Sequence, residues 1–75
     1  MKIENINTNV SGSSVWNQGR NPGDELIVVL NLGNIDVELQ DKYVEIAEST
    51  LSDDMDDDDV EYALTHGIWD NVCNG

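Results

Sequence analysis

Acidic residues dominate this 75-residue chain, and they are concentrated toward its C-terminal end. Sixteen Asp and Glu stand against three Lys and Arg, which gives a formal net charge of −13. After Lys42 there are ten acidic residues and no basic one. Self-repulsion of this charge opposes a compact state, so a folded centre depends on the clustered Ile, Leu and Val and on the two Trp and two Tyr. We expect one small acidic domain over residues 1–75.

The composition argues against several functional classes. One His, one Cys and three bases offer no paired imidazoles, Cys cluster or phosphate clamp, so we expect no enzyme, no cofactor and no resident metal. A strongly acidic chain is repelled by DNA, RNA and anionic membranes, so the expected partner is a basic protein. Cys73 has no second cysteine to pair with, and residues 1–10 lack the apolar run of a signal peptide. We therefore expect a cytoplasmic protein.

The segment DELIVVLNLGNIDVEL, residues 24–39, predicts a β-hairpin. Two β-rich runs flank Gly33-Asn34, which suits a two-residue loop. The implied register pairs Leu32 with Ile35, Leu30 with Val37 and Val28 with Leu39. Because side chains alternate across a strand, this register places all six aliphatic residues on one face.

The opposite face of this hairpin is expected to be mostly polar. Asp36 and Glu38 share it, at about twice the ~3.3 Å rise of a strand. Ile27 and Val29 lie on the same face and indicate cover by the N-terminal segment or by a partner, such as a second copy in a homodimer. Upstream, residues 19–24 (GRNPGD) are rich in turn formers, and residues 6–10 and 15–18 are candidates for short strands.

Two helices are predicted downstream. Asp41 is expected to cap a helix that runs to about Leu51, with Val44 and Ala47 facing the core. A second helix is expected to begin within residues 56–59, where acidic side chains oppose the positive end of the helix dipole. Its apolar residues recur every four positions, at Val60, Leu64, Ile68 and Val72, and Gly67 is a potential early end. The predicted fold is α+β: a short antiparallel sheet followed by two acidic helices.

Two patterns approach metal-site spacings without meeting them. An EF-hand loop that started at Asp54 would have acids at its third and fifth positions, but Asp59 replaces the required glycine and Thr65 the final glutamate. His66, Asp70 and Cys73 at i, i+4 and i+7 would suit zinc only on a helix that continues through Gly67. We expect neither a dedicated calcium site nor a zinc site, and weak divalent-ion binding stays an alternative.

The acidic residues are expected to form a partner-binding surface. Asp41, Glu45 and Glu48 follow i, i+4 and i+7, so their carboxylates line one helix face. Regular negative charges on a rigid scaffold resemble the phosphate track of a nucleic acid, and an aromatic residue would supply an apolar anchor. The predicted contact residues are Asp36, Glu38, Asp41, Glu45, Glu48, Asp53, Asp54, Asp56, Asp57, Asp58, Asp59 and Glu61, with Tyr62 and Trp69 as the aromatic candidates.

In its length, its charge, its DDMDDDDVE run at residues 53–61 and its row of Asp41, Glu45 and Glu48, the chain resembles the small acidic inhibitors of phages and mobile elements. These include DNA-mimicking anti-CRISPR and anti-restriction proteins. The resemblance implies a protein that occupies the basic DNA- or RNA-binding channel of a host defence protein and blocks substrate binding. The alternatives are an acidic adaptor or antitoxin-like module that neutralises one basic partner, and a weak divalent-ion-binding protein.

Overall fold

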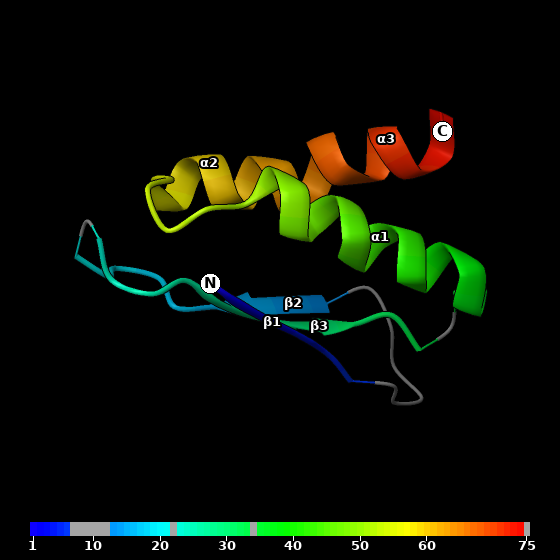
Figure 1. Cartoon of the computed structure of the whole chain (residues 1–75), viewed down its shortest axis with the longest axis horizontal. Helices are drawn as coiled ribbons and strands as arrows, with labels where there is room; N and C mark the ends of the chain where they lie inside the picture. The colour runs from blue at the N-terminus through cyan, green and yellow to red at the C-terminus, as the bar shows by residue number, and fades with distance from the viewer. Residues whose placement is uncertain (7–12, 22, 34, 75) are drawn as a thin grey trace.

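A computed structural model describes residues 1–6, 13–21, 23–33 and 35–74, and it has two layers: a small sheet and a helical layer on one side of it (Figure 1). The strands are β1 (Lys2–Asn5), β2 (Ser13–Trp16) and β3 (Ile27–Asn31). Their order is β1-β3-β2, with β1 parallel and β2 antiparallel to the central β3. The helical layer consists of α1 (Val37–Thr50) and a second helix built from α2 (Asp57–Tyr62), the π-helix η1 (Ala63–Gly67) and α3 (Ile68–Asn74). The α+β class is confirmed, but the sheet is mixed and not purely antiparallel as predicted, because β1 pairs with β3 in parallel.

The predicted hairpin is wrong after the turn that follows β3. The chain does turn there, because the Ile35 N–H donates to the Leu32 carbonyl at 3.1 Å; Asn34 of the predicted loop lies outside the described residues. Beyond the turn, however, α1 begins at Val37, and Asp36 is its N-cap. Val37 is 69% exposed and does not cover the sheet. Asp36 and Glu38 therefore do not share the strand face that the hairpin predicted.

Helical periodicity explains why these residues form a helix. Gln40, Tyr43 and Ala47 follow i, i+3 and i+7 and are buried, whereas Val37 and Leu39, expected in the core, are exposed. A strand would have buried Leu39 instead of Gln40. Burying a tyrosine and the inner face of a fourteen-residue helix removes more apolar surface from water than a short strand does.

Partly buried hydrogen bonds fix the start of α1 against the sheet. The Gln40 side-chain amide donates to the Ile35 carbonyl at 2.6 Å and accepts from the Asn5 amide at 3.0 Å. Asn5 in turn accepts from the Leu32 N–H at 3.4 Å. Gln40 is buried, so its amide requires partners, and these bonds join β1, the turn after β3 and α1.

The other helix boundaries agree in part with the sequence. Asp41 lies inside α1 and does not cap it, but α1 ends at Thr50, close to the predicted Leu51. The second helix begins at Asp57, within the predicted range. Gly67 does not end it, because the chain continues through η1 into α3.

The segments before β3 also agree in part. Strand β2 overlaps the predicted strand at Val15 and Trp16, while residues 7–10 of the other predicted strand lie outside the described residues. Gly19 and Gly23 have positive φ angles of 73° and 90°, as the predicted turn requires. The N-terminal segment pairs with β3 as β1 and does not cover Ile27, which is exposed on the sheet face away from the helices.

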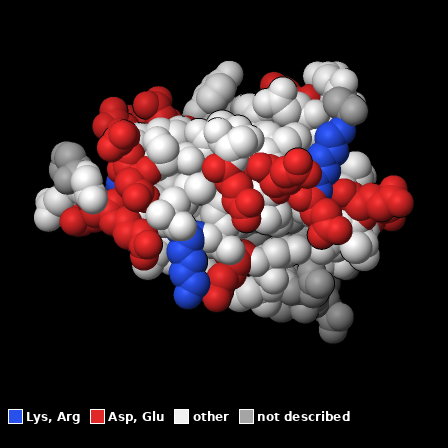
Figure 2. All heavy atoms as spheres, in the orientation of Figure 1, with Lys and Arg blue, Asp and Glu red and all other residues white. Residues whose placement is uncertain are grey.

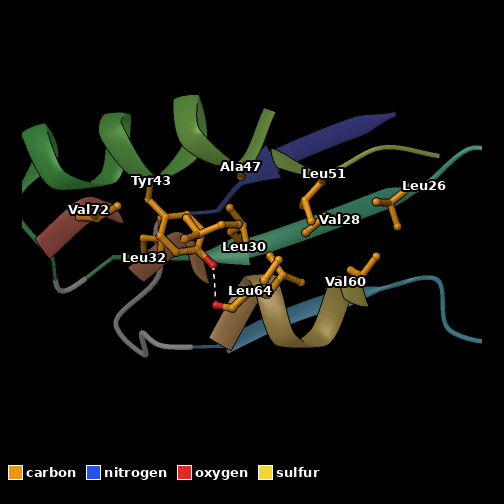
Figure 3. Close-up of a cluster of buried hydrophobic side chains, with 12 residues drawn as sticks. Leu26, Val28, Leu30, Leu32, Tyr43, Ala47, Leu51, Val60, Leu64 and Val72 are labelled. Atoms are coloured by element: carbon orange, nitrogen blue, oxygen red, sulfur yellow. Dashed lines mark hydrogen bonds between the residues drawn. The ribbon is translucent and has the colours of Figure 1, made fainter. Parts of the chain in front are cut away.

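The core lies between the two layers (Figure 3). Its buried apolar residues are Leu26, Val28, Leu30, Leu32, Tyr43, Ala47, Leu51, Val60, Ala63, Leu64, Ile68 and Val72. The residues predicted at every fourth position of the second helix are all in this set. Those predictions are confirmed, as is the burial of the inward-facing residues of β3.

Tyr43 links the two helices across the core. In η1 the Ile68 N–H bonds the Ala63 carbonyl, five residues earlier, as a π-turn requires. The neighbouring Leu64 carbonyl accepts from the Tyr43 hydroxyl at 2.8 Å (Figure 3). Burial raises the pKa of Tyr43 to about 12, so the hydroxyl stays a neutral donor across the ordinary pH range.

Replacing Tyr43 with Phe should lower the free energy of unfolding by about 1–3 kcal/mol, because a buried carbonyl loses its donor. Urea denaturation measures this, and Tyr62→Phe is the matched control because Tyr62 is 65% exposed. Unfolded tyrosine ionises near pH 10 and Tyr43 near 12, so wild-type stability should fall as pH rises between these values, and less so in Tyr43→Phe. Equal midpoints for the two variants would contradict this role of Tyr43.

Candidate acidic interface

Four carboxylates form a continuous row along α1, which we call the α1 stripe: Glu38, Asp41, Glu45 and Glu48. All four are exposed. Spacings of three and four residues place them on one helix face over about 15 Å. The predicted row of three is therefore extended by Glu38, which joins it only because the helix begins at Val37. Lys42 lies beside the stripe, is half-buried and is the one basic residue of α1.

Further exposed acids continue the negative surface beyond both ends of α1. Figure 2 shows acidic side chains in patches from one end of the molecule across to the other, with basic side chains between some of the patches. Asp36 is exposed at the N-cap of α1. At the opposite end, the exposed acids of the 53–61 run are Asp54, Asp56, Asp58, Asp59 and Glu61.

Two acids of the same run are half-buried and contact other segments of the chain. The Asp53 carboxylate accepts from the Leu26 N–H at 2.9 Å and lies 3.2 Å from the N-terminal ammonium group. The hydrogen bond from Leu26, followed by the contact with that ammonium group, holds the pKa of Asp53 below its usual range. Asp57 accepts a hydrogen bond from the Gly19 N–H. Both residues hold segments together, so we assign them to the fold.

Arg20 organises the loop that carries these acids. Its side chain is only 5% exposed, and its guanidinium donates to the Asp53 carbonyl at 2.8 Å and to the Met55 carbonyl. Its Nε lies 3.7 Å from the Asp57 carboxylate. This contact was not predicted from the sequence. The one available signal was a single Arg inside a turn-forming segment of an otherwise acidic chain.

The two aromatic candidates differ in exposure. Trp69 is half-buried and its ring packs on Tyr43, with the ring centroids 4.6 Å apart. Tyr62 is 65% exposed, and its ring lies 5.2 Å from that of His66. Asp58 and Glu61 line the same shallow surface hollow as Tyr62. Tyr62 is thus the aromatic residue that the structure places among exposed carboxylates.

Over the described residues, no three His, Cys, Asp or Glu side chains come together as metal ligands. Cys73 is exposed. In the same part of the chain, no helix is both long and apolar enough to span a bilayer. No protein-family model, curated protein or solved structure matches the sequence or the fold.

Neutralising Asp53 and its neighbour Asp54 should have opposite consequences. Asp53→Asn should lower the thermal midpoint at pH 7, because the ammonium group loses its counter-charge, whereas Asp54→Asn removes an exposed repulsive charge and should leave the midpoint unchanged or raise it. Because the folded pKa of Asp53 is depressed, its contribution exists above the unfolded pKa near 4 and is lost as pH falls through the folded value. The thermal midpoints of Asp53→Asn and wild type should therefore converge at low pH.

Thermal melts from pH 7 down to pH 2 measure both effects. A stability for Asp53→Asn that equals that of Asp54→Asn at every pH would show that Asp53 belongs to the free acidic surface.

Proposed function

We propose that this protein is a nucleic-acid-mimicking inhibitor of the anti-CRISPR or anti-restriction type. It acts in the cytoplasm of a host cell, where it occupies the basic DNA- or RNA-binding channel of a defence protein and blocks substrate binding. The observation that carries the proposal is the α1 stripe: four exposed carboxylates held at helical spacing, with one half-buried base beside them.

A helix holds these charges in fixed relative positions. Four charges over about 15 Å are sparser than the one charge per ~1.7 Å of a DNA duplex. The exposed acids beyond both ends of α1 lengthen the negative surface. Such a surface would be attracted to the sites where a basic channel binds phosphates, and it would steer association at high rates.

Charge alone would give speed more than affinity, so an apolar contact is also needed. Tyr62 fits this role because it is exposed and lies beside Asp58 and Glu61. Inhibition then requires occupancy only, with no catalytic step.

The test compares wild type with two variants that have the same net charge as each other, and each of the three proteins is immobilised. The first neutralises three carboxylates of the α1 stripe: Asp41→Asn, Glu45→Gln and Glu48→Gln. The second neutralises three exposed acids elsewhere: Glu4→Gln, Asp24→Asn and Glu25→Gln. Both leave Asp53 and Asp57 intact, because those residues hold the fold. Each protein is exposed to a nuclease-treated bacterial lysate.

We expect wild type and the second variant to retain a nucleic-acid-binding protein that duplex DNA elutes, and the stripe variant to lose it. Elution should also respond to salt, but less steeply than for duplex DNA because the surface charge is sparser. Retention by the stripe variant as strong as by wild type would contradict the proposal. Elution by salt but not by DNA would favour the adaptor alternative.

A further inference from the structure

The two edges of the sheet differ in their protection. The outer strand β1 carries Lys2 and Glu4, whose side chains lie 3.7 Å apart. Charged side chains at a sheet edge discourage pairing with another chain. The other outer strand, β2, has the sequence SSVW, with neither a charge nor a proline. Among the described strands none pairs with β2 on its side away from β3, so β2 is the edge at which a strand could be added.

The register shows which backbone groups β2 presents. The Asn17 N–H donates to the Ile27 carbonyl, so the hydrogen-bonded pairs alternate from there and include Val15 with its partner on β3. Ser14 and Trp16 occupy the intervening positions. Their N–H groups consequently point away from β3, toward the free edge.

A cavity of about 250 Å³ adjoins this edge. Its walls include Ser14 from β2, Leu30 and Leu32 from β3, Tyr43 from α1, Leu64 from η1 and Trp69 from α3. Thr65 also lines it and is exposed, which places the opening between β2 and the second helix. Ligand pockets for small molecules are usually larger than ~300 Å³, so this cavity suits a single apolar side chain.

We propose that an extended segment of the basic partner adds to β2 as a fourth strand and inserts one apolar side chain into this cavity. Directly opposed residues of neighbouring strands share a sheet face, so the partner residue opposite Ser14 would direct its side chain toward the cavity. The inference rests on the proposed function, because it describes how the partner of the acidic surface is held.

Charge identifies the occupant as a segment with Lys or Arg on either side of the apolar residue. Glu61 is exposed one helical turn before Thr65, whose hydroxyl donates to the Glu61 carbonyl at 2.8 Å. Asp70 is exposed beside Trp69. Both acids are thus exposed on the helix that contributes Leu64, Thr65 and Trp69 to the cavity. A second copy of the chain is disfavoured at this edge, because each copy has a net charge of −13.

The probe is a nine-residue peptide of alternating Lys and Val with a central Leu, acetylated and amidated at its ends. Calorimetry at 0.15 M salt measures its affinity for three proteins: wild type, Ser14→Pro and Val15→Thr. Proline at residue 14 removes an outward N–H without breaking the ladder to β3. Val15 is the control because it is exposed on the opposite sheet face.

We expect Ser14→Pro to weaken binding about tenfold and Val15→Thr to change it less than twofold. A peptide with central Ala should bind wild type about tenfold more weakly than the Leu peptide. On wild type, the Leu peptide should also shift the amide resonances of Ser14 and Trp16, a measurement that does not depend on the folding of the proline variant. Equal affinity for the Leu and Ala peptides, unchanged amide resonances, or self-pairing of β2 in the free protein would each overturn the inference.

The two proposals fail in different ways. If the stripe variant loses the lysate protein while Ser14→Pro retains it, the β2 inference is wrong and the proposed function stands. If the peptide binds at β2 as described while the stripe variant still retains the lysate protein, the edge site is real and the mimicry is wrong.

Discussion

The buried guanidinium of Arg20 is the contact on which the helical layer depends. It reaches the carbonyls of Asp53 and Met55, more than thirty residues along the chain, and so ties the loop between α1 and α2 to the turn between β2 and β3. A buried guanidinium is strongly destabilising when its partners are absent. Here the two terminal nitrogens donate to carbonyls, and the carboxylate of Asp57 lies 3.7 Å from Nε, which is buried and has no hydrogen-bond partner among the described residues. A cation therefore holds the acidic loop between α1 and α2.

The parts of the fold that could be predicted are those written in short-range patterns. The second helix was predictable because its apolar residues keep one spacing from Val60 to Val72, and nothing else competes with that pattern. The predicted hairpin was wrong because Val37 and Leu39 fit strand alternation. Tyr43, whose burial favours a helix, lies further along the chain. Contacts such as that of Arg20 join distant segments, and no local pattern announces them. The acidic surface was predictable in composition, but its division into structural and exposed carboxylates was not.

That division connects stability with function. Asp53 and Asp57 are used to hold segments together, whereas the α1 stripe and the remaining acids of the 53–61 run face solvent. Like charges on one surface repel and destabilise the folded state. Higher salt or mild acid should relieve this repulsion. At low pH, protonation of Asp53 should act in the opposite direction, because its stabilising contacts as a carboxylate are lost. The proposed function would give this surface a role, because a basic channel would attract it.

The most direct measurement of the central claim is a competition between this protein and DNA for one partner. A fluorescein-labelled duplex is first bound to the nucleic-acid-binding protein retained from the lysate. The acidic 75-residue protein is then titrated into that complex while the anisotropy of the duplex is recorded. We expect the acidic protein to release the duplex once it saturates the partner at a stoichiometric ratio. We expect the stripe variant to release little of it. A stable complex that contains the partner, the duplex and the acidic protein together would contradict the proposed function.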